Sequence, residues 1–312
     1  MKIDPRRLLE VLAVARHGSF SSAAEALNVS QPALSQSIAL LERELGMRIL
    51  DRGRHGAKVN KSGEVLLFHA EALAELLGRA REEMELQARG MQGSLAIGIT
   101  PITSSGLLPE ALQVMLHEAP EVSVSIVEGL DTEIIRLLRT RKLDLVLSRL
   151  GTQPRYTDIT EERLFSVDWA VVMRPRHPLC DSRSLQLNGL EDQHWVLPAS
   201  GSAFREQLEL VFNKAGTGWP VRSIITNSIL TIKAIVMNTD CITVISPRLV
   251  EVEVAAGRLH AVPLEDIGSL REVGLAWRRS DRLSPIATRF REIVRQIANP
   301  EGAASDAVDR KR

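Results

Sequence analysis

The sequence has little cysteine, no net charge and no long apolar run. Its two cysteines, Cys180 and Cys241, lie far apart and match no metal-ligand or redox spacing, so we expect both to be reduced. No stretch approaches the about 20 apolar residues that a membrane-spanning helix needs. The first residues, MKIDPRRLLEVLAVA, lack the apolar segment and cleavage site of a signal peptide. These absences exclude a disulfide-stapled domain and predict a cytoplasmic protein with no membrane partner.

The motifs of common enzyme classes are also missing. The chain contains no Gly-x-Ser-x-Gly, no His-Glu-x-x-His, no phosphate loop ending in Gly-Lys-Ser/Thr and no Gly-x-Gly-x-x-Gly. The seven histidines are scattered, and His17, His69 and His177 are typical of surface or packing positions. We therefore expect no catalytic activity, no bound metal and no cofactor.

The zero net charge hides an uneven distribution. Residues 1–62 carry ten Lys/Arg against six Asp/Glu, a surplus of four positive charges, whereas residues 63–90 carry three against six. A local basic surplus favours contact with a polyanion even in a neutral chain.

Three sections separate by pattern, within a chain of 312 residues that is 44% hydrophobic. Residues 1–62 predict short helices, and residues 63–90 predict one long helix. From residue 91 to 300, β-branched runs such as LAIGIT, LDLVLS and CITVISP alternate with helical stretches, which predicts an α/β domain with parallel strands. Its second lobe is expected at about 167–275 and includes the strand VGLAWRR. Residues 301–312 are expected to form a flexible tail.

The segment 19–46 predicts two helices joined by a tight turn. The first helix is expected to begin at Ser21 or Ser22, and small alanines allow the second to approach it closely. Ser30 is expected to cap the second helix, and Gly46 to end it. At 100° per residue an apolar stripe faces the core and a polar face lies opposite. The apolar stripe is Leu34, Ile38, Leu41 and Leu45.

The polar face suits the DNA major groove, where short donors and acceptors near a helix start can reach base edges. We expect contacts to double-stranded DNA from Ser30, Gln31, Pro32, Ser35, Gln36 and Arg43. A basic hairpin follows, and its side chains Arg52, Arg54, Lys58 and Lys61 are expected to contact the phosphate backbone or minor groove before a helix starts at Ser62. The alternatives are an ordinary helical hairpin and a solvated charged loop.

The stretch GSFSSAAEALNVSQPALSQSIALLERELGMRILDR resembles the winged helix-turn-helix of LysR-type transcriptional regulators. Many members have arginine at the position of Gln36, and arginine favours guanine whereas glutamine favours adenine. The resemblance implies an α/β protein with an all-α N-terminal domain, a linker helix and a two-lobed α/β effector domain similar to periplasmic solute-binding proteins. It also implies promoter DNA, a small-molecule effector, RNA polymerase and self-association as a dimer or dimer of dimers.

The long helix carries apolar or small residues at alternating steps of four and three, which is a heptad seam. The seam predicts that two copies of this helix pair, and it consists of Leu66, Ala70, Leu73, Leu77, Ala80 and Met84. The alternative is a helix packed on its own domain.

Polar residues follow several strands of the α/β section, where loops and helix starts commonly bind ligands. The predicted effector-binding residues are Thr100, Thr103, Ser104, Arg149, Ser200, Ser202, Thr226 and Asn227. Each hydroxyl is equally suited to capping a helix, and Arg149 to being an exposed strand-end charge. The segments LDLVLSRL and TNSILTIKAIV resemble the subgroup of the galactose-binding-protein regulator, which implies a sugar or organic acid as effector. The competing function is an α/β enzyme or solute-binding protein whose N-terminal helices only dimerise.

Overall fold

The computed structural model describes residues 3–53, 56–88, 93–151, 156–200, 203–265 and 271–299, so the expected tail at 301–312 lies outside the described residues. The chain divides into two compact units. The first comprises Met1–Gly93 with Arg139–Leu143, and the second comprises Ser94–Leu138 with Asp144–Arg312. Within the described segments, no helix is both long enough and apolar enough to cross a membrane.

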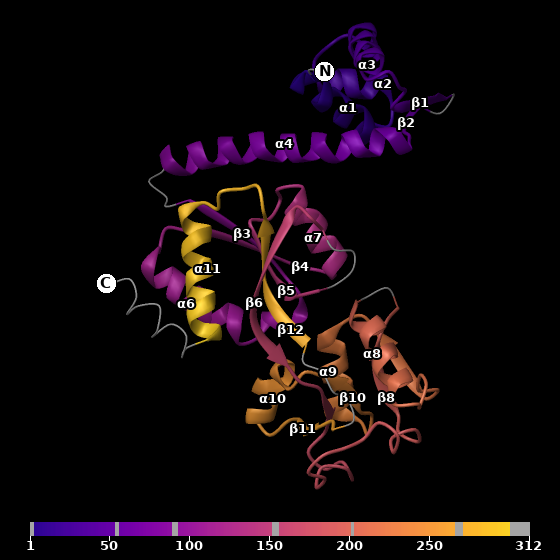
Figure 1. Ribbon diagram of the computed structural model, residues 1–312, viewed down its shortest axis with the longest axis vertical. Helices are drawn as coiled ribbons and strands as arrows, with labels where there is room; N and C mark the ends of the chain where they lie inside the picture. Colours follow the sequence, from indigo (N-terminus) through magenta and orange to yellow (C-terminus); the bar gives the residue numbers. More distant parts are fainter. Residues whose placement is uncertain are drawn as a thin grey trace. The chain divides into compact units, whose positions relative to one another are not determined.

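The first unit is a helical domain with a two-stranded hairpin (Figure 1). Its elements are α1 (Pro5–His17), α2 (Phe20–Ala26), α3 (Gln31–Leu45), β1 (Leu50–Gly53), β2 (Gly56–Val59) and α4 (Lys61–Ala88). Leu34, Ile38 and Leu41 are buried in its core, as the apolar stripe predicts. Ala23 and Ala24 are buried beside them, so α2 and α3 pack closely.

Local capping sets the ends of α2 and α3. The Ser30 hydroxyl accepts the Ala33 N–H at 3.3 Å, and Gly46 ends α3 in the left-handed conformation at φ 71°, as predicted. The expected cap of α2 is wrong: Ser19 caps it, and its Oγ accepts the Ser22 N–H at 3.1 Å. Ser19, Ser21 and Ser22 offer the same hydroxyl, and the extended backbone of Ser19 decides that it is the cap.

The first lobe of the second unit is built on a five-stranded sheet in the order β4-β3-β5-β12-β6. Strands β3, β4 and β5 pair in parallel, and β12 pairs antiparallel with both β5 and β6. The elements are β3 (Ser94–Ile99), α5 (Pro101–Ser104), α6 (Leu107–Glu118), β4 (Ser123–Glu128), α7 (Asp131–Arg139), β5 (Leu145–Arg149), β6 (Ile159–Val167), β12 (Arg271–Arg278) and α11 (Pro285–Ala298).

The placement of β12 corrects the expected extent of the second lobe, which was to include this strand. β12 returns to the first sheet and lies between β5 and β6, so the prediction that VGLAWRR belongs to the second lobe is wrong. Its residues have strand character in the sequence, but the choice of sheet depends on long-range pairing that no local pattern carries.

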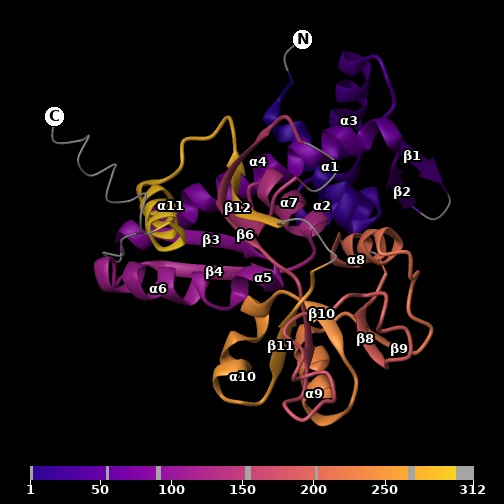
Figure 2. The same cartoon turned by 60° about the horizontal axis from the view of Figure 1, so that its bottom comes forward.

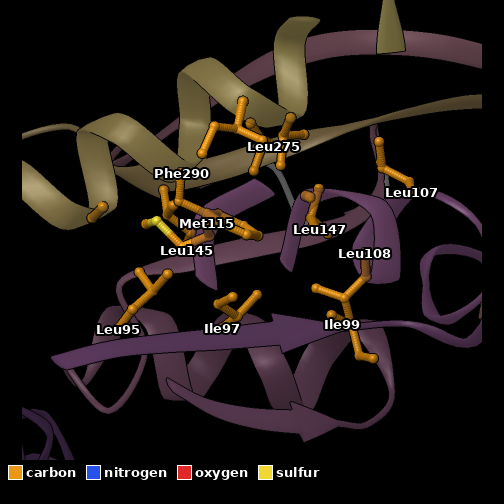
Figure 3. Close-up of a cluster of buried hydrophobic side chains, with 14 of the residues drawn as sticks. Leu95, Ile97, Ile99, Leu107, Leu108, Met115, Leu145, Leu147, Leu275 and Phe290 are labelled. Carbon is orange, nitrogen blue, oxygen red and sulfur yellow. The ribbon is translucent and has the colours of Figure 1, made fainter. Parts of the chain in front are cut away.

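Helices α6 and α11 cover this sheet and form its main core. Met115 of α6 and Phe290 of α11 point toward Leu95, Ile97 and other apolar side chains of the strands (Figure 3). At the surface, Arg289 of α11 and Glu118 of α6 form an ion pair at 2.6 Å, which lowers the pKa of the Glu118 carboxyl. The buried cluster makes the lobe a rigid base for the loops at its strand ends.

The second lobe contains two small sheets, β10-β7-β11 and β8-β9 (Figure 2). β7 pairs antiparallel with both neighbours, and β8 pairs parallel with β9. The elements are β7 (Ala170–Met173), β8 (Trp195–Pro198), α8 (Ala203–Lys214), β9 (Ser223–Thr226), α9 (Ile229–Asn238), β10 (Thr243–Ile245), the short η1 (Pro247–Val250), α10 (Glu251–Ala255) and β11 (His260–Pro263). Two α/β lobes were predicted, and this fold class is confirmed.

Candidate functional site

The outer face of α3 is polar and open to solvent. Gln31, Pro32, Gln36 and Arg43 are exposed, and Ser35 is half-buried. Ser30 is also exposed while its hydroxyl caps the helix. At 100° per residue, Pro32, Gln36 and Arg43 lie on one side of α3, whereas Gln31 projects from the first turn in a different direction.

Both acidic residues of α3 are bonded within their own unit. The Glu42 carboxylate accepts the N–H groups of Ile49 and Leu50 at 2.9 and 3.3 Å, which attaches the start of the hairpin to α3. Glu44 forms an ion pair with Arg7 of α1 at 2.6 Å. The charge of Glu44 is thus paired with Arg7, the Glu42 carboxylate is bound by the start of the hairpin, and Arg43 remains exposed.

The β1-β2 hairpin lies against the end of α1. The Ala57 N–H donates to the Gly18 carbonyl at 2.9 Å, and a Cβ on Gly56 would come within 2.2 Å of that carbonyl oxygen. Gly56 also has φ +117°, so this close approach requires glycine. The hairpin is therefore fixed relative to α3.

Basic residues are distributed along this hairpin. Lys58 is exposed in β2, and Lys61 is exposed as the first residue of α4. Arg52 lies in β1 with its side chain outside the described part, and Arg54 falls outside the described residues altogether. The expected helix start at Ser62 is one residue late, because Asn60 caps α4 by accepting the Gly63 N–H at 3.0 Å.

The predicted seam of α4 divides into a covered half and an open half. Ala70 is 0% exposed and Leu66 packs on the first unit's core, so the prediction that Ala70 faces a second chain is wrong: its own chain covers it. Leu73 is half-buried. Leu77 and Met84 are 53% and 66% exposed, and Ala80 is exposed with them. Of the predicted seam residues, those that are exposed lie on the second half of the helix.

A cavity of about 510 Å³ opens in the second unit, where strand ends and helix starts from both lobes meet. Its volume is in the range of small-molecule sites. Thr100, Arg149, Ser200, Thr226 and Asn227 line it, as predicted from the sequence. The Thr226 hydroxyl accepts the Ser228 N–H at 3.2 Å, so it also shapes the start of α9.

Two other predicted residues, Thr103 and Ser104, are described but do not line the cavity. The Thr103 hydroxyl is fully buried and bonds to the carbonyls of Thr100 and Leu147, both at 3.0 Å. The Ser104 hydroxyl donates to the Pro101 carbonyl at 2.7 Å. Their assignment to the effector site is therefore wrong, because backbone carbonyls occupy both hydroxyls. Ser202 lies outside the described residues.

Arg149 is the centre of a polar cluster in the cavity wall. Its Nη2 lies 3.0 Å from Asp131 Oδ2, and its Nη1 donates to Gln207 Oε1 at 2.8 Å. The guanidinium carbon lies 5.9 Å from the centre of the Phe204 ring. The side chains of Arg149 and Asp131 are only 8% and 7% exposed, so this is a buried ion pair rather than an exposed strand-end charge.

Among the described residues that line the cavity, Thr100 and Asp131 each carry a buried oxygen, Oγ1 and Oδ1, with no hydrogen-bond partner in the described structure. A buried polar atom without a partner costs about 1–3 kcal/mol, so such atoms commonly mark a ligand position. Asp131, Phe204 and Gln207 were not predicted from the sequence. Asp131 was accessible to the same reasoning as Thr100, because it follows the β4 strand and begins α7.

Two family models match the chain. The model of the bacterial regulatory helix-turn-helix protein, lysR family, covers residues 6–64, and the LysR substrate binding domain covers residues 88–299. The chain belongs to the LysR family of transcriptional regulators. It is thus a DNA-binding regulator with an effector-binding domain and not an enzyme, which overturns the competing enzyme hypothesis.

Individual LysR-family proteins are similar over nearly the full length. The chain is 28% identical over 294 residues to the RuBisCO operon transcriptional regulator of Allochromatium vinosum, covering 94% of this chain and 96% of that protein. It is 30% identical over 298 residues to the regulator PcaQ of Agrobacterium fabrum, covering 95% and 96%. The structure of full-length CbnR complexed with its target DNA matches with a TM-score of 0.63 at 23% identity, covering 95% and 100%.

Proposed function

We propose that this LysR-family regulator reads promoter DNA through the exposed face of α3 and binds a small polar effector in the cavity of its second unit. The proposal for α3 is supported by its exposed Gln31 and Gln36 beside an exposed Arg43, on a helix whose carboxylates are bonded internally. Amide side chains suit adenine edges, whereas Arg43, Lys58 and Lys61 suit phosphates. We include Arg52 and Arg54 among the phosphate-contacting residues because of their positions in the sequence alone.

Replacing Gln36 by alanine is expected to weaken binding to preferred DNA by about 1–3 kcal/mol and to relax the preference at one base pair, because a base-edge contact is lost. The DNA would be selected by the wild-type chain from a random pool, and affinities measured by fluorescence anisotropy. Gln36 is exposed, so the variant should fold as the wild-type chain does.

Lys58→Ala is the matched control, since a phosphate contact carries no sequence information. This variant should weaken binding to all sequences alike and reduce the salt slope by about one. If Gln36→Ala behaved in the same way as Lys58→Ala, the role of Gln36 in reading bases would be refuted.

The proposal for the cavity rests on one observation, the pair of buried and unpartnered oxygens Thr100 Oγ1 and Asp131 Oδ1. Ser200, Thr226 and Asn227 add polar groups on the opposite lobe. A ligand that satisfies groups from both lobes favours one arrangement of the lobes, and it can shift the regulator's balance of states only through such differential binding.

Thr100→Val is expected to reduce effector affinity by about 1–3 kcal/mol, because a ligand group is left unpaired. The chain without ligand should lose no stability, since the hydroxyl has no partner to lose. A thermal-shift screen of metabolites on the intact chain supplies the ligands. Ser104→Ala is the control, because Ser104 lies nearby without lining the cavity, and it should leave affinity unchanged. Ligands that bind both variants as tightly as wild type would place the effector elsewhere.

Self-association completes the proposal. The exposed Leu77, Ala80 and Met84 of α4 offer an apolar strip to the same helix of a second copy, with Leu73 at its edge. A dimer, or a dimer of dimers, would then present two copies of α3 to DNA. From the family resemblance we also expect the protein to lie in the cytoplasm, to contact RNA polymerase and to bind a sugar-like effector.

A further inference from the structure

The cavity wall carries more negative than positive side chains. Three carboxylates line it, those of Glu128, Asp131 and Glu133, against the single guanidinium of Arg149. Glu128 and Glu133 are exposed at the end of β4 and on the first turn of α7. Glu133 lies close to the Gly129 backbone, since a Cβ there would lie 3.2 Å from Glu133 Oε2. The potential of such a site attracts cations and repels anions.

The positive charge of Arg149 is already neutralised. Asp131 holds one end of the guanidinium at 3.0 Å and Gln207 accepts from another at 2.8 Å. Both charges are buried, and a carboxylate ligand competing for Arg149 would bring a further negative charge beside Asp131. The site therefore provides no free cation for an organic acid among its described lining residues.

The buried oxygens without a hydrogen-bond partner indicate which ligand group would bind here. Asp131 is 6% exposed, and its Oδ1 has no partner while its Oδ2 bonds to Arg149. A carboxylate oxygen can only accept hydrogen bonds, so its partner must be a donor. Thr100 Oγ1, 2% exposed and also unpartnered, can accept from the same ligand. Two acceptors and two rim carboxylates match an N–H donor with positive charge.

We infer that the effector of this regulator bears an amino or related cationic group, which donates to Asp131 Oδ1 and Thr100 Oγ1. This inference rests on the proposed effector site and replaces the organic acid named as one expectation from family resemblance. The positive charge faces Glu128 and Glu133, and the rest of the ligand lies toward Ser200 and Asn227 of the second lobe.

The test compares probe molecules that have a similar carbon skeleton and differ in charge. Glucosamine, glucose and glucuronate form one set, and putrescine, butanediol and succinate form the other. Each is titrated onto the intact chain at neutral pH, with binding followed by isothermal calorimetry and thermal shift. We expect an amine to bind about tenfold or more tightly than its carboxylate counterpart. Added salt should narrow this ratio, because the rim carboxylates are exposed.

Two variants test whether these residues cause the preference for amines. Replacing Glu128 and Glu133 by glutamine should remove most of the amine preference, and Thr100→Val should weaken the amine that binds. Carboxylates that bind as tightly as amines, or amines that do not bind, would overturn the inference. If a carboxylate probe bound and its affinity fell in Thr100→Val, the proposed effector site would be supported and only the inferred ligand class would be wrong. If no probe responded to Thr100→Val, the proposed site itself would fail.

Discussion

A chain carrying Leu77→Glu and Met84→Glu is expected to lose its dimer and at least about 100-fold in affinity for DNA with two half-sites. Both side chains lie on the open half of α4, 53% and 66% exposed, so their replacement leaves no cavity in the first unit. Charges on both helices of a pair would have to be buried or pushed apart. Sedimentation velocity measures the assembly, and fluorescence anisotropy measures the DNA affinity.

Leu76→Glu is the matched control for this variant. Leu76 is 46% exposed and is the neighbour of Leu77, but it lies 100° around the helix from it. The control should remain a dimer and keep its DNA affinity. If Leu76→Glu dissociated the dimer and the double variant did not, the pairing surface would be the adjacent strip of α4.

Asp131→Ala is expected to destabilise the effector domain by about 3–5 kcal/mol, because it leaves the buried Arg149 without its counter-charge. In a domain of this size the loss lowers the melting temperature by about 6–20 °C. Scanning calorimetry of the intact chain measures the change in melting temperature. This method can resolve more than one transition in a chain with two compact units.

Two further variants separate the charge effect from a general weakness of α7. Glu133→Ala removes an exposed carboxylate from the same helical turn and should change stability by about 0.5 kcal/mol or less. Combining Asp131→Ala with Arg149→Met removes the unpaired charge and should recover most of the loss. A double variant as unstable as Asp131→Ala alone would show that the ion pair does not account for the effect.

Local signals in the sequence predicted the start, the end and the buried face of α3. Ser30 and Gly46 act within one turn of their own positions, and the stripe of Leu34, Ile38 and Leu41 follows from helical periodicity. The seam of α4 was only half right, because periodicity shows that Ala70 faces something apolar without showing that its own chain supplies the contact.

The effector site was harder to predict because its contacts are distant in sequence. Thr100 and Thr103 are one turn apart and chemically identical, yet the carbonyl of Leu147 on another strand occupies only the hydroxyl of Thr103. Likewise, Arg149 ends the strand β5, but its partners Asp131 and Gln207 come from helices before and after it in the sequence. Strand ends therefore located the cavity, whereas its charge balance required the fold.

Selection of DNA from a random pool by the intact wild-type chain tests whether paired copies of α3 read sequence. We predict enrichment of an interrupted palindrome, with half-site centres separated by about 10 base pairs or a multiple of that spacing. The Leu77→Glu, Met84→Glu chain should fail to enrich it. A pool that remains random after selection by the wild-type chain, or that yields only isolated half-sites, would show that paired copies of α3 do not read sequence.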